Sequence, residues 1–165
     1  MKKQSMPLLA AALLCAALLP ATAQEIVRHK IPGSDFPIAQ AVSIPPNATI
    51  HFISGQVPPV VDKTASGDSL AAFGNTRQQT VGVLNKIRDI LAGMGLTMGD
   101  VVKMQVFIVG DPAKGNKGDV AGFMEGYTQF FGGAQPNLPA RAVFQVAALS
   151  NPGWLIEIEV VAAKK

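Results

Sequence analysis

The residues best suited to chemistry are an arginine and two glutamates near the end of the chain. Arg141 follows Leu138-Pro139-Ala140 and precedes the apolar run 142–144. A guanidinium in such surroundings keeps its charge, so it must meet an anion, solvent or a partner chain. Its planar fork suits a carboxylate held by two hydrogen bonds. The alternative is a structural ion pair from Arg141 to Glu157 or Glu159, and the spacing alone favours neither.

Glu157 and Glu159 alternate with isoleucines and therefore share one face of a predicted strand. Two carboxyl groups at this spacing could form a coupled acid pair that holds and moves a proton. The same spacing is also typical of the polar face of an ordinary strand. The pattern alone favours this second interpretation.

Two other motifs are weaker. Gly67-Asp68-Ser69-Leu70 spells the short signature of GDSL hydrolases, whose nucleophilic serine needs Asp and His partners. That signature belongs near the start of its domain with a histidine far downstream, but His51 precedes Ser69, so we interpret the segment as a loop entering a helix. We expect His51 to be half-buried within a strand and His29 to be exposed.

The first 23 residues resemble a secretory signal peptide. A basic start, Met1 to Lys3, precedes the apolar run from Pro7 to Pro20 and the small residues Ala21-Thr22-Ala23. The apolar run is too short to span a bilayer comfortably. We therefore expect cleavage after Ala23, a location in the periplasm or outside the cell, no membrane association after cleavage, and a single domain over residues 24–165.

Removal of the leader changes the charge and the available ligands. Twelve basic residues would then face 11 acidic ones, a formal net charge of +1 instead of +3. Nucleic-acid binding driven by bulk charge is therefore excluded. Cys15, the only cysteine, would also be lost, and two histidines remain. Zinc enzymes usually need three protein ligands, so we expect no metal and no Cys-based chemistry.

Hydrophobic periodicity predicts an α+β domain with element order β-β-α-β-α-β-β. Two helices would lie on one face of a mixed sheet. The predicted strands with clear bounds are Thr49–Ser54, Asp100–Val109, Arg141–Leu149 and Trp154–Ala163, and the predicted helices are Thr76–Met94 and Asp119–Phe131. The segments Pro32–Pro46 and Gly55–Gly67 are rich in turn residues and are predicted to be irregular.

Each predicted element has a face that must be covered. The first helix would bury Thr80, Leu84, Ile87, Leu91 and Met94, and the second would bury Phe123, Tyr127, Phe130 and Phe131. The sheet face away from the helices is too apolar to be fully solvated, because it would carry Val101, Gln105, Phe107, Phe144 and Val161. This face predicts oligomerisation.

Six short blocks, in order and spacing, resemble the RidA/YjgF family of reactive-intermediate deaminases, also called the L-PSP endoribonuclease family. The resemblance covers residues 37–162. The blocks are Ser54-Gly55-Gln56-Val57-Pro58, the helix end Asn85–Gly95, Asp100–Phe107, Tyr127-Thr128-Gln129-Phe130-Phe131, Pro139-Ala140-Arg141 and Ile156–Ala162.

The resemblance implies a chorismate mutase-like fold and a homotrimer with a site in each of three clefts between subunits. It implies hydrolysis of enamine and imine intermediates of amino acids to 2-keto acids and ammonia, without metal or organic cofactor. By this resemblance, Arg141 binds the substrate carboxylate and Glu157 positions the attacking water. Ser54 and Gly55 help to line the site.

Three positions depart from the family pattern. Ile38 stands where many members carry a tyrosine, Met124 where many carry an asparagine, and Val143 where a cysteine is common. The site would keep its carboxylate anchor and lose three polar side chains. Substrates with a larger, more apolar side chain would fit this change.

Three functions compete at this point. The first is a periplasmic imine deaminase, and the second is a non-catalytic trimeric binder of small carboxylates in the same clefts. The third is a ribonuclease or translation inhibitor, activities ascribed to some family members. A net charge near zero, few aromatic residues and export argue against nucleic-acid partners.

Export gives a direct prediction. Because an Ala-x-Ala site follows the apolar run, N-terminal sequencing of the protein from its native host should begin at Gln24 or within one or two residues of it. An intact Met1 in a soluble cytoplasmic fraction would contradict the expected export.

Overall fold

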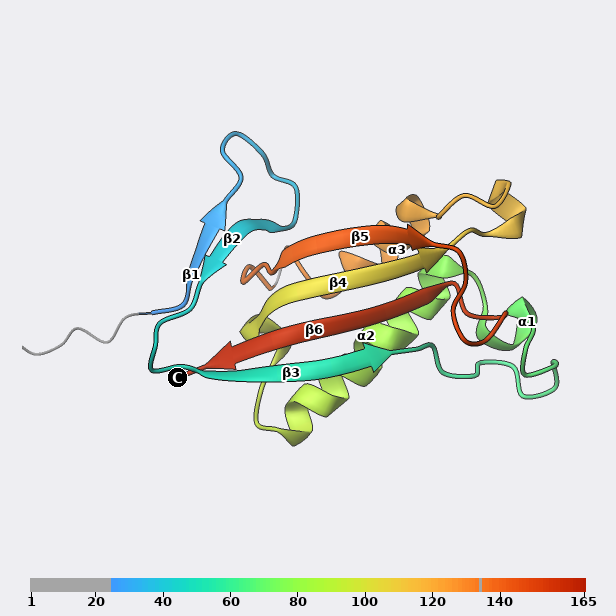
Figure 1. Cartoon of the computed structure of the whole chain (residues 1–165), viewed down its shortest axis with the longest axis horizontal. Helices are drawn as coiled ribbons and strands as arrows, with labels where there is room; N and C mark the ends of the chain where they lie inside the picture. Colours follow the sequence, from blue (N-terminus) through green and yellow to red (C-terminus); the bar gives the residue numbers. More distant parts are fainter. Residues whose placement is uncertain (1–24, 134) are drawn as a thin grey trace, which may run out of the picture.

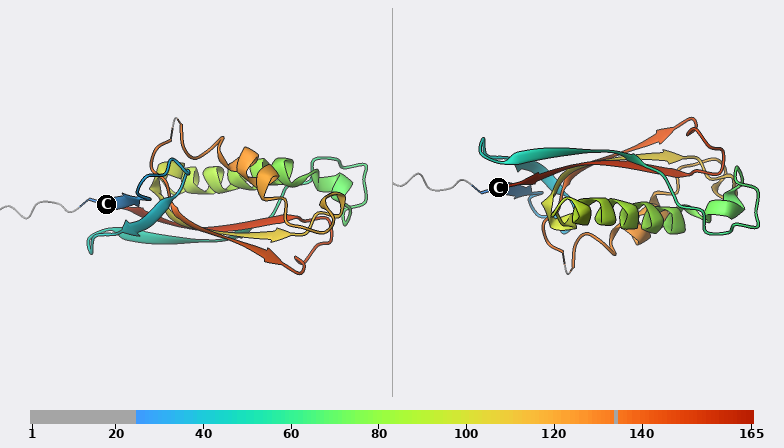
Figure 2. Two further views of the ribbon diagram at one scale, coloured as in Figure 1. Left: turned by 90° about the horizontal axis from the view of Figure 1, so that it is seen from above. Right: turned by 90° about the horizontal axis from the view of Figure 1, so that it is seen from below.

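The computed structural model describes residues 25–133 and 135–165, so the predicted leader lies outside the described part. A six-stranded sheet carries its helices on one face (Figures 1 and 2). The strands are β1 Val27–Lys30, β2 Ala39–Ser43, β3 Thr49–Gln56, β4 Val101–Val109, β5 Ala140–Val146 and β6 Ile156–Lys164. The helices are α1 Leu70–Phe73, α2 Thr76–Gly93 and α3 Val120–Tyr127, with short 3-10 turns at Met98–Asp100 and Pro112–Lys114.

The strand order is β1-β2-β5-β4-β6-β3. Strand β4 runs parallel to β5 and antiparallel to β6, which pairs antiparallel with β3. The β1–β2 hairpin joins this unit at one parallel pair, Ala39 with Ala140. This arrangement confirms the α+β prediction of a mixed sheet with helices on one face.

Local signals in the sequence define helix α2. Asn75 and Gln78 form a reciprocal capping box at its start, which satisfies two backbone N–H groups that would otherwise be unpaired. Leu84, Ile87 and Leu91 are fully buried against the sheet. The prediction for Met94 was wrong, because the helix ends at Gly93 and the Met94 side chain is 47% exposed.

Helix α3 packs closely against α2. Its cap is the predicted Asp119, whose carboxylate accepts from Gly122 N at 3.1 Å. A Cβ on Gly126 would lie 2.8 Å from Thr80 Cβ, so only glycine allows this approach. The helix ends at Tyr127, four residues before the predicted end, yet Phe131 is still fully buried.

Two further predictions were wrong in instructive ways. The segment Pro32–Pro46 contains β2, because its turn residues flank Ala39–Ser43 rather than interrupt it, and the sheet gains a sixth strand. Val101 is buried instead of lying on the open face. The pairing of β4 with β6 shifts by one residue between Val101 and Lys103, and such a bulge changes the face of the residues before it.

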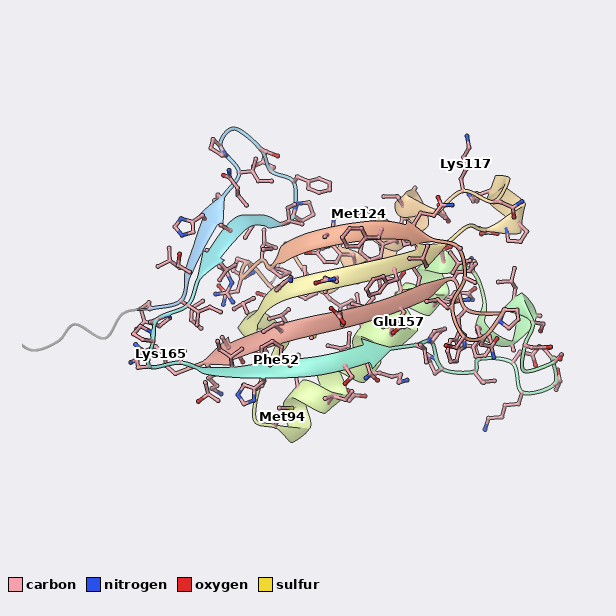
Figure 3. The ribbon with its side chains drawn as sticks, viewed as in Figure 1. Phe52, Met94, Lys117, Met124, Glu157 and Lys165 are labelled. Atoms are coloured by element: carbon pink, nitrogen blue, oxygen red, sulfur yellow. The ribbon has the colours of Figure 1, made fainter. Side chains whose placement is uncertain are left out.

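The two faces of the sheet differ in cover. Met104, Val106 and Ile108 point into the core beneath α2 and α3. The other face is bare and carries large apolar side chains: Phe144 is 47% exposed and Phe52 is 82% exposed. Figure 3 labels Phe52 on β3. Among residues 25–133 and 135–165, no helix is long and apolar enough to cross a membrane.

Candidate functional site

Arg141 lies on the helix-covered side of the sheet. It pairs with Met104 of β4, whose side chain is buried in the core, and paired residues of neighbouring strands share a face. The Arg141 guanidinium therefore extends from β5 toward α3. There Met124 projects beside β5 (Figure 3).

Aromatic rings surround the guanidinium. Its Cζ lies 4.2 Å from the ring centre of Tyr127, 5.0 Å from that of Phe123 and 5.5 Å from that of Phe36. Rings at such distances attract a cation through their quadrupole. The Tyr127 hydroxyl donates to Pro37 O at 2.7 Å, which fixes the loop that carries Phe36 against α3. Two of the three rings belong to α3, so this helix positions the arginine.

Within the described chain, the Arg141 guanidinium has one hydrogen-bond acceptor at its Nη atoms, and that acceptor is weak. Nη2 donates to the thioether sulfur of Met124 at 3.3 Å, and sulfur is a weak acceptor. Nη1 is buried and has no hydrogen-bond partner among the described residues. Burial lowers the pKa of Arg141, and the nearby Tyr127 offsets this in part. A buried N–H without an acceptor is costly, and an anion that reached Nη1 would supply the missing acceptor.

The alternative of an ion pair from Arg141 to Glu157 or Glu159 is wrong for the described chain. Glu157 pairs with Phe107 and Glu159 with Gln105, and these residues of β4 alternate with the buried Met104. Both glutamates therefore lie on the open face, while Arg141 lies on the helix side. Figure 3 labels Glu157 on β6, the strand next to the edge strand β3.

Glu157 packs against Gly55 of β3. A Cβ on Gly55 would overlap Oε1 of Glu157 and lie 3.0 Å from its Cδ, so a larger residue would displace the carboxylate. The register of β3 with β6 shifts between Ile53 and Gln56, which places Gly55 beside the acid. Ser54 is exposed, and Glu157 is half-buried. These three residues form the second half of the candidate site.

The other predicted site residues lie with Arg141. Met124 contacts the guanidinium, and Val143 shares its face because it pairs with the buried Val106. Ile38 is half-buried and precedes Ala39, whose N–H donates to Pro139 O at 2.9 Å next to the start of β5. One chain therefore gathers Arg141, Ile38, Met124 and Val143 on one side and Ser54, Gly55 and Glu157 on the other.

The aromatic partners of Arg141 were missed as site residues. The sequence indicated Phe123 and Tyr127 only as buried helix positions, and Phe36 gave no signal within an irregular segment. A lone tyrosine on an apolar helix was the available clue, because a buried hydroxyl needs a hydrogen-bond partner.

The weaker motifs have structural roles. His51 is half-buried, and His29 is exposed with Nε2 at 2.9 Å from Ser43 Oγ, as expected for both. Ser69 precedes α1, and its hydroxyl donates to Ser66 O at 2.7 Å, which agrees with a loop entering a helix. In the described ranges, His, Cys, Asp and Glu side chains form no group of three that would hold a metal ion.

Comparisons with known proteins agree on one family. The family described as Endoribonuclease L-PSP matches residues 34–164. The human 2-iminobutanoate/2-iminopropanoate deaminase is 35% identical over 133 residues, which cover 81% of this chain and 84% of that protein.

Solved structures give the same result. The crystal structure of Escherichia coli TdcF with bound serine has a TM-score of 0.55 and 30% identity, and the match covers 86% of this chain and 99% of TdcF. A structure from Thermotoga maritima, titled as a candidate endoribonuclease, has a TM-score of 0.53 and 27% identity, covering 86% of this chain and 98% of that one.

This chain therefore belongs to the RidA/YjgF, or L-PSP endoribonuclease, family. Its relatives include proteins named as a reactive intermediate deaminase and as a 2-iminobutanoate/2-iminopropanoate deaminase. Binding of a small amino acid is recorded for its structural neighbour TdcF.

The site gives a prediction about pH. Burial raises the pKa of Tyr127 to about 12, although the Arg141 charge acts in the opposite direction. The phenol should therefore stabilise the fold fully below its unfolded pKa of about 10. That contribution should be lost as the pH rises from 10 toward 12.

Tyr127 is the only tyrosine, so tyrosinate absorbance reports this residue alone. The folded protein should titrate near 12 and the denaturant-unfolded chain near 10. Tyr127→Phe is the control, because other groups also titrate in this range. The difference in unfolding free energy between wild type and this variant should shrink as the pH rises. A folded-state midpoint near 10 would show that the phenol is not buried as described.

Proposed function

We propose that the protein hydrolyses 2-imino acids, in equilibrium with their enamines, to 2-keto acids and ammonia. The observation that carries the proposal is the Arg141 guanidinium, held by three rings with Nη1 buried and lacking an acceptor in the described chain. A substrate carboxylate would supply that acceptor. Two charge-assisted hydrogen bonds would then fix the orientation of the adjacent C=N group.

The chemistry needs orientation and one proton acceptor. The oxygen of a water molecule attacks C2 of the imine, the C=N π electrons move to nitrogen, and a tetrahedral amino alcohol forms. Collapse to the C2 ketone breaks the C–N bond and releases ammonia. Glu157 would orient the water, take its first proton and deliver it to the imine nitrogen. On collapse, Glu157 would carry the remaining hydroxyl proton to the departing nitrogen, which leaves as ammonia. Because an imine is already electrophilic, positioning supplies most of the required acceleration.

The sheet separates these two residues within one chain, so we propose that the site forms between subunits. Arg141 of one subunit would face Gly55 and Glu157 of its neighbour in a homotrimer. The bare apolar face supports this arrangement, since Phe52 and Phe144 would be covered by the neighbouring sheets. A single subunit would carry the residues of both halves, but on opposite faces of its sheet. A complete site would therefore need two subunits.

A second candidate is a binder of small carboxylates that does not turn them over. The separation of Arg141 from Glu157 favours this function. Within one described chain, the contacts of the Arg141 guanidinium are aromatic rings and a thioether, and Glu157 lies on the other face of the sheet. Turnover of imines assayed beside ligand-induced stabilisation separates the two functions. A melting shift with carboxylates and no turnover would support the binder.

We also propose that either function operates outside the cytoplasm, after removal of residues 1–23. The mature protein would need no cysteine and no metal for this chemistry. An oxidising compartment would therefore leave Arg141 and Glu157 intact.

The role of Arg141 gives the principal functional prediction. Arg141→Lys keeps the charge but replaces the fork by a point donor, so it should lower kcat/KM on a 2-imino acid by about a hundredfold or more. The control is Arg77→Lys, because Arg77 is an exposed residue that pairs only loosely with Glu125, at 3.7 Å.

Measurement of the melting temperature on the same samples separates binding from folding. Arg141→Lys should stay folded, and added carboxylate should no longer stabilise it. Near-normal turnover by a folded Arg141→Lys variant would refute the anchoring role.

A further inference from the structure

We propose that the site selects 2-imino acids with aliphatic or aromatic side chains, and that Met124 is a specificity-determining residue. The inference rests on the proposed function, because it assumes that Arg141 holds the carboxylate. It concerns the part of the substrate that does not react.

The described contacts of the guanidinium are three aromatic rings and one thioether. The single hydroxyl among them, on Tyr127, already donates to Pro37 O. Val143 adds another apolar side chain on the same face of β5. A substrate side chain next to the carboxylate would therefore meet carbon and sulfur. A polar side chain would lose its water there without gaining a partner from this half of the site, which is unfavourable.

Among these apolar side chains around the guanidinium, Met124 and Phe36 are the ones that a ligand can reach. Phe123 and Tyr127 are fully buried and cannot contact much of a ligand. Phe36 is 48% exposed, and Met124 is half-buried with its sulfur 3.3 Å from Nη2. A carboxylate that takes both Nη1 and Nη2 would displace this weak sulfur contact. The freed methionine, with three rotatable bonds, can repack against an apolar side chain of variable shape.

The expected selectivity follows from the free energies of burying apolar and polar groups. Each additional buried CH₂ group favours binding by a few-fold, so the imine of leucine should exceed that of alanine by about tenfold or more in kcat/KM. An apolar site rejects an added hydroxyl only moderately, so the imine of serine should react slowly but measurably. The imine of aspartate should be the poorest substrate, because its side-chain carboxylate would be desolvated without a partner.

The experiment compares two substitutions of Met124 on imines that an amino-acid oxidase generates in situ from leucine and serine. Met124→Gln keeps the length and helix propensity and adds an amide that can pair with a hydroxyl. It should lower the leucine-to-serine ratio of kcat/KM by about tenfold. Met124→Leu keeps the apolar character and should leave that ratio within about threefold of wild type. A purely structural role would lower both rates together and leave the ratio unchanged.

Binding of the products keeps this test separate from the proposed function. Calorimetry should show 4-methyl-2-oxopentanoate, the keto acid from leucine, binding more tightly than pyruvate. If no imine is turned over but this preference holds, the deaminase function fails and the specificity inference stands. If imines are turned over with equal or better rates for alanine and serine, the deaminase function stands and the inference is overturned. An unchanged ratio in Met124→Gln would also overturn the role of Met124.

Discussion

A guanidinium that cannot lose its charge, placed among apolar side chains, is the constraint on which the site depends. Tyr127, Phe123 and Phe36 hold Arg141 by cation–π contacts, and Met124 supplies only a weak acceptor. The hydrogen bond from Tyr127 to Pro37 O ties the loop before β2 to α3 and keeps the three rings together. An anion bound here would supply an acceptor for the buried Nη1, which has no partner among the described residues. Without α3 packed beside it, the Arg141 guanidinium would have no fixed orientation.

The alternation of side chains between the two faces of a sheet imposes the second constraint on the site. Arg141 shares its face with Met104, whereas Glu157 shares its face with Phe107, so the sheet itself stands between anchor and acid. No side-chain rotation within one chain can bring them together. The proposed second subunit would solve this problem and would also cover the exposed Phe52 and Phe144. Gly55 completes that half of the site, because its missing side chain leaves room for the Glu157 carboxylate.

The sequence predicted most of the elements because their signals are local. The Asn75 end of α2, the Asp119 cap and the alternation around Glu157 are all readable within a few residues. Strand β2 was missed because turn residues on both sides masked a strand of five residues, and the burial of Val101 depends on a bulge that pairing alone creates. The rings around Arg141 come from residues that lie 14 to 105 positions from it in the sequence, so periodicity carried no information about them. The family resemblance supplied the roles of Arg141 and Glu157, which spacing alone left open.

The central claim is that each site combines Arg141 of one subunit with Glu157 of the next. Arg141→Ala and Glu157→Gln variants carrying different affinity tags can be co-expressed, and trimers containing both can be isolated with the two tags. In a cyclic trimer of either composition, one site of three takes both of its functional residues from unaltered positions, so activity should return to about one third of wild type. Each variant alone should be nearly inactive. Mixed trimers no more active than the separate variants would contradict a site shared between subunits.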